Sequence, residues 1–147
     1  MKATILSYSI ITALAFIFLV SIALISYSYL STFEESFRDA TANLLAYHLI
    51  SEISQIYQKG SNISNNKIIL EKRIVLPEKL YSNDYRIGFV ANDGWYKLVI
   101  SLDGIEKNFD LPRMQINLGG EAKGGEIMLV YNRSVINGEI KNSIIIK

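Results

Sequence analysis

The chain has 147 residues, half of them hydrophobic, with 15 Lys and Arg against 14 Asp and Glu. This length leaves room for one membrane anchor and one small domain, and it excludes a large multidomain machine. The near balance of charge provides no field that would attract nucleic acid, so no nucleic-acid partner is expected. The absence of cysteine excludes disulfides, thiolate zinc sites and cysteine nucleophiles, but leaves the compartment open.

The N-terminal segment, residues 1–30, predicts a transmembrane helix. Residues 3–33 carry no charge, and about 20 apolar residues suffice to cross roughly 30 Å of hydrocarbon. The run exceeds the roughly 7 to 15 residues of a signal-peptide core, and Lys2 is a thin positive flank, so an anchor is favoured over a cleaved secretory signal. Tyr27 and Tyr29 close the run with side chains typical of a membrane–water interface.

The orientation of this anchor follows from the charges at its two ends. Lys2 and the amino terminus are the positive groups before the span, whereas Glu34 and Glu35 come first after it, so we expect a single-pass protein with its C-terminal head outside the cell membrane. Two tripeptides with the N-glycosylation pattern, beginning at Asn62 and Asn132, fall in the predicted head, which agrees with export.

The helix is predicted to continue beyond the membrane as an amphipathic extension, residues 31–59. Neither Gly nor Pro occurs before position 60, so one continuous helix over residues 2–58 is the simplest interpretation. Its apolar residues recur mostly at helical spacing, namely Phe33, Phe37, Leu44, Leu45, Leu49, Ile53 and Ile56. This stripe requires a partner, which could be the head, neighbouring copies or the membrane surface. The last is the poorest, because Arg38 is the only Lys or Arg among residues 33–58.

From Leu44 onward we expect the helix to pack under a β-sheet, while Phe33 and Phe37 would contact other subunits. The head, residues 60–147, changes to a period of two, which indicates strands with one buried face. Strands are predicted at 68–76, 85–91, 95–102, 105–111, 114–118, 126–132 and 139–146. Loops are expected at Pro77, Gly119-Gly120, Gly124-Gly125 and Asn137-Gly138.

The predicted fold class is therefore α+β: a long N-terminal helix followed by a small antiparallel β-sandwich or a curled sheet packed on the helix. The last strand would be an exposed edge unless it pairs within the chain or with another subunit.

No catalytic residue, cofactor site or metal site is predicted, and the protein is not expected to be an enzyme. His48 is the only histidine, and its place in the amphipathic helix favours a partly buried or interfacial side chain over a base or ligand. Trp95 and Tyr96 open a strand after a hairpin, where we expect them to plug the end of the core rather than form an exposed contact. The Gly pairs do not precede a helix, so they do not predict a phosphate-binding loop.

Met1-Lys2-Ala3 followed by Thr4 resembles a minimal class III signal peptide, and the whole layout resembles archaeal type IV pilin-like proteins. The resemblance implies cleavage between Ala3 and Thr4, a hydrophobic helix packed in a filament core, and a head on the outside. The subunit would act by polymerising or capping, with the membrane and other pilin-like subunits as partners in a homo- or hetero-oligomer. Bacterial pilins have Glu as the fifth mature residue where this chain has Tyr8, and the span lacks Gly, which favours a minor subunit.

The layout is also similar to archaellum stator-type proteins. In those, a single span carries a sandwich domain that stays in the envelope and binds the surface layer, so a surface-layer protein would be the partner. The two interpretations share one fold and differ in whether the span leaves the bilayer. A membrane-anchored enzyme is the third alternative, and it is the weakest because the inventory of chemical groups is nearly empty.

Overall fold

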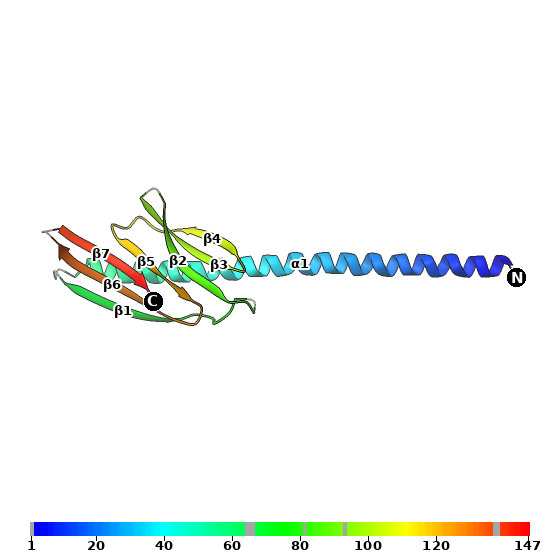
Figure 1. Ribbon diagram of the computed structural model, residues 1–147, viewed down its shortest axis with the longest axis horizontal. Coiled ribbons are helices and arrows are strands. Elements are labelled where there is room, and N and C mark those ends of the chain that lie inside the picture. Colours follow the sequence, from blue (N-terminus) through cyan, green and yellow to red (C-terminus); the bar gives the residue numbers. More distant parts are fainter. Residues whose placement is uncertain (1, 64–66, 81, 93, 137–138) are drawn as a thin grey trace. The chain divides into compact units, whose positions relative to one another are not determined.

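The computed structural model describes residues 2–63, 67–80, 82–92, 94–136 and 139–147, with side-chain surroundings given from Ala13 onward. The chain divides into two compact units, Met1–Asp39 and Ala40–Lys147, and each is described by itself. One long helix, α1 (Lys2–Ser61), precedes seven strands (Figure 1). The predicted α+β class is thus confirmed.

Helix α1 runs without interruption for 60 residues, which confirms the single helix predicted from the absence of Gly and Pro. It ends three residues later than predicted. At its end, the guanidinium of Arg133 donates to the carbonyl oxygens of Gly60 (3.5 Å) and Ile63 (2.5 Å). Carbonyl groups in the last turn have no partner within the helix, so a cation placed there satisfies them and stabilises the end.

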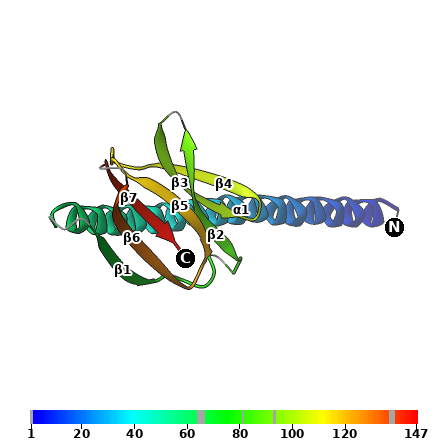
Figure 2. The ribbon, with the colours of Figure 1, turned by 60° about the vertical axis from the view of Figure 1, so that its left-hand side comes forward.

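The strands form one sheet in the order β1-β6-β7-β5-β2-β3-β4 (Figures 1 and 2). Their bounds are β1 Ile68–Val75, β2 Tyr85–Asn92, β3 Trp95–Leu102, β4 Ile105–Asp110, β5 Asn117–Lys123, β6 Glu126–Ile136 and β7 Glu139–Ile146. Neighbouring strands are antiparallel except β5 and β7, which are parallel. The C-terminal strand β7 is paired on both sides within the chain, so it is not an exposed edge.

Strand β5 differs most from its prediction, which placed a strand at 114–118 and a loop at Gly119-Gly120. Both glycines lie inside β5. Gly120 has a φ of 93°, and a Cβ at this position would lie within 2.9 Å of the backbone nitrogen of Ile146 and collide with its carbonyl oxygen. A glycine inside a strand often marks such a close approach of two backbones, and here it admits β7.

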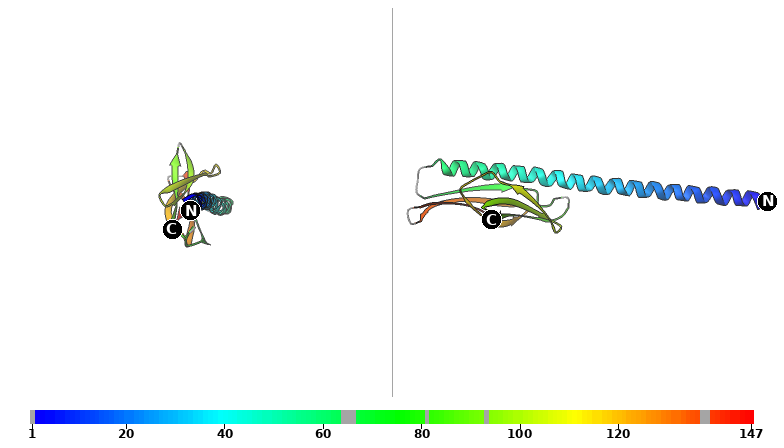
Figure 3. Two further views of the ribbon diagram at one scale, coloured as in Figure 1. Left: turned by 90° about the vertical axis from the view of Figure 1, so that its right-hand side faces the viewer. Right: turned by 90° about the horizontal axis from the view of Figure 1, so that it is seen from above.

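The core of the second unit lies between helix α1 and one face of the sheet, as Figure 3 shows. The helix contributes a buried stripe of Leu45, Ala46, Leu49, Ile53 and Ile56, and the sheet contributes residues that include Tyr85, Ile87, Leu98, Ile100, Ile127, Leu129, Tyr131, Ile144 and Ile146. These helix and strand residues form one cluster of buried side chains.

Leu44 is an exception, because its side chain is 72% exposed. It precedes Leu49 by five residues, which turns it about 140° around the axis of a helix with 3.6 residues per turn. Its neighbour Leu45 faces the core instead. The prediction for Leu44 was therefore wrong, because its side chain points away from the face of the helix that carries Leu45 and Leu49.

A polar contact also joins the helix to the sheet. Lys72 on β1 forms an ion pair with Glu52 on α1 and lies 3.4 Å from the side-chain oxygen of Gln55. The side chain of Glu52 is only 15% exposed, so its charge is largely withdrawn from water. Lys72 points inward from an edge strand, a placement that also discourages pairing of this edge with other chains.

Replacing Lys72 by methionine is expected to lower the free energy of unfolding by about 1–3 kcal/mol, because the carboxylate of Glu52 is then buried without its partner. The double variant Lys72→Met with Glu52→Leu should recover most of that loss, since it removes both charges and keeps the volume. Urea denaturation of the full chain in detergent, followed by circular dichroism, measures both. Equal losses in the single and double variants would show that the ion pair is not what the substitution disturbs.

Candidate functional surfaces

The most extensive candidate surface is the apolar side of the first unit. From Ala13 to Thr32 every described side chain is exposed, and the large hydrophobic ones among them include Phe16, Phe18, Leu19, Ile22, Leu24 and Leu30. The described part of the chain contains one helix that is long and apolar enough, by length and composition, to cross a membrane, and no residue of its apolar window is buried. A helix that is hydrophobic all round requires lipid or other apolar helices around it.

Phe33 and Phe37, the predicted subunit contacts, lie one turn apart in the same unit. Their ring centroids are 6.4 Å apart, with the ring planes inclined by 20°, and both side chains are more than half exposed. Stacked, exposed aromatic rings offer a large apolar area at low cost in side-chain entropy, which suits a contact with another molecule. Their use as a subunit contact stays a prediction.

The predicted processing site lies at the start of the first unit, where Ala3 and Thr4 follow the first helical residue, Lys2. Of the two predicted glycosylation sites, Asn62 is exposed in the turn after α1. The serine of its tripeptide, Ser64, lies outside the described residues. Asn132 is also exposed, but its backbone is fixed in β6 between two neighbouring strands. An asparagine in a turn is more accessible to a modifying enzyme than one held in a strand, so Asn62 is the better placed of the two. Cleavage and glycosylation both stay predictions.

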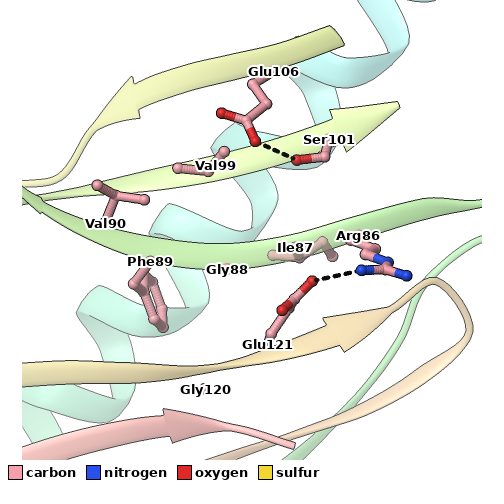
Figure 4. A pocket seen from close by; sticks show the side chains of 10 residues that line it. All are labelled: Arg86, Ile87, Gly88, Phe89, Val90, Val99, Ser101, Glu106, Gly120 and Glu121. Carbon is pink, nitrogen blue, oxygen red and sulfur yellow. Dashed lines mark hydrogen bonds and ion pairs between the residues drawn. The ribbon is translucent and has the colours of Figure 1, made fainter. Parts of the chain in front are cut away.

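The outer face of the sheet, away from the helix, contains a shallow hollow of about 230 Å³ between β2, β3 and β5 (Figure 4). Gly88 and the buried side chain of Val99 lie at its centre. At its rim Arg86 lies 3.6 Å from Glu121, and the hydroxyl of Ser101 donates to Glu106 over 3.5 Å. The acidic groups at the rim are thus engaged with neighbours.

Three further expectations concern reactive and aromatic residues. His48 is exposed, so the partly buried alternative is wrong, and an interfacial position stays a prediction. Trp95 is 45% exposed, and the guanidinium of Arg113 lies 4.3 Å from the centre of its ring. The prediction that Trp95 fills the end of the core is therefore wrong. Its ring is partly exposed and packs against the guanidinium of Arg113. Among the described residues, no group of three or more His, Asp or Glu side chains is placed to hold a metal ion.

Two tyrosines of the head, Tyr85 and Tyr131, have buried rings and hydrogen-bonded hydroxyls. The hydroxyl of Tyr85 donates to the carbonyl oxygen of Pro77 over 2.6 Å, and burial raises the pKa of Tyr85 from its ordinary value of 10.0 to about 12. The hydroxyl of Tyr131 lies 3.0 Å from the side-chain oxygen of Asn142, and burial likewise raises the pKa of Tyr131. Both hydroxyls thus donate to acceptors within the fold at partly buried positions.

The raised pKa of Tyr85 predicts a loss of stability in alkaline solution. The folded chain keeps this proton at pH values where the unfolded chain releases it, so the contribution is complete below about pH 10 and is lost as the pH rises to about 12. Tyr85→Phe should remove one late step from the absorbance titration of the tyrosines and leave that of Tyr131. The exposed Tyr47→Phe serves as the control, and an unchanged late phase in Tyr85→Phe would contradict the assignment.

Comparison with known proteins gives no relative for this arrangement: no protein-family model, no curated protein and no solved structure matches the chain significantly.

Proposed function

We propose that the protein is a structural subunit of a type IV pilus-like filament on the cell surface, held in the membrane by its N-terminal helix until it assembles. The head faces outside, and the subunit acts by polymerising or by capping. The observation that carries this proposal is the exposed, charge-free surface of the first unit, on a helix that also supplies the core of the head.

The same apolar surface suits both stages of such a life cycle. In the bilayer it is solvated by lipid, and every backbone polar group of a helix is satisfied internally. In a filament the helices of neighbouring subunits replace the lipid, at little cost because both environments are equally apolar. Phe33 and Phe37, at the end of the charge-free run, would then contact neighbouring subunits.

The second unit supports a structural role by what its surface offers. Its buried residues are apolar and close-packed between helix and sheet, and the hollow on the outer face holds acidic groups already paired with neighbours. A domain of this kind is suited to a structural role on the outside of a filament.

N-terminal sequencing of the native protein, combined with its fractionation between membranes and sheared filaments, tests the proposal. We expect the protein in filaments to begin at Thr4. Ala3→Ile, which enlarges the residue before the predicted cut, should keep residues 1–3 and leave the protein in the membrane, whereas Ala13→Ile makes the same change in the span and should assemble normally. An intact Met1 on protein found only in membranes would contradict the filament and favour the stator-like alternative.

A further inference from the structure

The end of the head where α1 stops carries apolar side chains that are left exposed. The β6–β7 hairpin reaches past the last turn of the helix (Figure 1). The ring of Tyr131 lies against Gly60 and is fully buried, whereas Val135, further along β6, and its partner Ile140 on β7 are 42% and 53% exposed. Alternate residues of a strand share a face, so Val135 continues the core face of Tyr131 beyond the reach of the helix. Ile136, on the other face, is 47% exposed.

Positive charge gathers at the same end of the head, around Arg133. Each of three exposed lysines is the chain neighbour of a residue that bonds to or pairs with this arginine: Lys59 of Gly60, Lys67 of Ile68 and Lys141 of Asn142. Within the part of the chain that the structure describes, none of the three lysines forms an ion pair. Their charges are therefore available to a partner.

The charge at this end differs in sign from that of the rest of the chain. The two segments that form it, residues 56–70 and 131–144, contain four Lys and Arg and a single carboxylate, Glu139. The other residues contain 11 Lys and Arg against 13 Asp and Glu. A local excess of one sign attracts a partner of the opposite sign, so this end is complementary to an anionic surface.

The apolar side chains indicate which anionic surface this is. We call the combined set the tip: Lys59, Lys67, Val135, Ile136, Ile140 and Lys141. A nucleic acid is bound through bases that stack on aromatic side chains, whereas the apolar members of the tip are aliphatic. Aliphatic side chains beside lysines match the surface of an anionic bilayer, where the former enter the headgroup boundary and the latter face the lipid phosphates.

We propose that the tip binds the surface of an anionic lipid bilayer. The second unit joins the anchor at Ala40, and the last turn of α1 lies about 30 Å further along the helix, at about 1.5 Å per residue. The tip is thus at the opposite end of this unit from its attachment point, and the bilayer that it binds is a different one from that which holds the anchor. The inference concerns the head alone and does not depend on filament formation.

Cosedimentation with vesicles tests the binding. The full chain is held in nanodiscs of zwitterionic phosphatidylcholine and mixed with vesicles either of the same lipid or with about a third of phosphatidylglycerol. We expect the protein to sediment with the anionic vesicles only, and less so as salt is raised. Lys67→Ala with Lys141→Ala should weaken this binding about 25-fold, since each cation near an anionic surface is worth about fivefold.

Two further variants separate the apolar contribution from general charge. Ile136→Ser with Ile140→Ser should weaken the binding at least about tenfold, because it removes the side chains that enter the headgroup boundary. Lys123→Ala with Lys147→Ala removes two exposed lysines at the opposite end of the β6–β7 pair and should bind as the original chain does.

The other outcomes overturn the proposal. Equal binding to both kinds of vesicle would show that the anionic lipid is not recognised, and an equal loss in the two lysine variants would show that only the charge of the whole chain matters. Undiminished binding by the isoleucine variant would show a purely electrostatic contact, as expected for an acidic polysaccharide. The nanodiscs hold isolated subunits, so each result stands whether or not the protein forms filaments.

Discussion

Replacing Gly120 by alanine is expected to destabilise the head by about 2–6 kcal/mol, which combines overpacking with a backbone that alanine adopts poorly. The residue has a φ of 93°, and its missing side chain is the space taken by the carbonyl group of Ile146. Because the obstacle is backbone rather than a flexible side chain, relief requires β5 and β7 to separate. These two strands form the one parallel pair among the described strands.

The adjacent glycine provides a matched control. Nothing lies within 4 Å of a Cβ added to Gly119, and its φ is not positive, so Gly119→Ala should change the stability by no more than about 0.5 kcal/mol. Urea denaturation in detergent, followed by the circular dichroism of the sheet, measures both variants. If the two alanine variants unfold at the same urea concentration, the contact between β5 and β7 at Ile146 is not as close as described.

Local patterns were sufficient to predict most of the elements. The β2–β3 and β3–β4 hairpins follow from alternating residues that meet at glycines with positive φ, Gly94 and Gly104. Strand β5 could not be found in this way, since Gly119 and Gly120 look like a loop until the parallel partner β7 is in place. Partners that lie far apart in sequence leave no periodic signal in either strand.

The candidate surfaces likewise differ in whether their residues are neighbours in the sequence. The charge-free run of the first unit is contiguous in sequence, so it could be predicted directly. The hollow on the outer face joins Arg86, Val99 and Glu121 from three strands, and only the sheet topology brings them together. For Trp95, the ring partner Arg113 lies beyond β4 in the chain, so no local signal pointed to an exposed cation–π pair.

The double variant Phe18→Asp with Ile22→Asp is expected to abolish membrane association. An aspartate at the centre of a spanning helix costs about 2.5–3.5 kcal/mol, and each replaced apolar residue had favoured insertion by about 0.3–0.6 kcal/mol, so the pair should shift the partition between membrane and water by roughly 10⁵-fold. Both positions are exposed in the first unit and lie near the middle of the charge-free run. The measurement is the share of protein that sediments with membranes after an alkaline carbonate wash.

Phe18→Leu with Ile22→Val is the control for that variant, because it changes the same two positions and keeps them apolar. It should sediment as the original chain does. Neither residue belongs to the core of the second unit, so the circular dichroism of the head should be the same in both variants. A correctly folded aspartate variant that stayed in the washed membranes would show that something other than this helix holds the protein there, and the proposed filament subunit would lose its anchor.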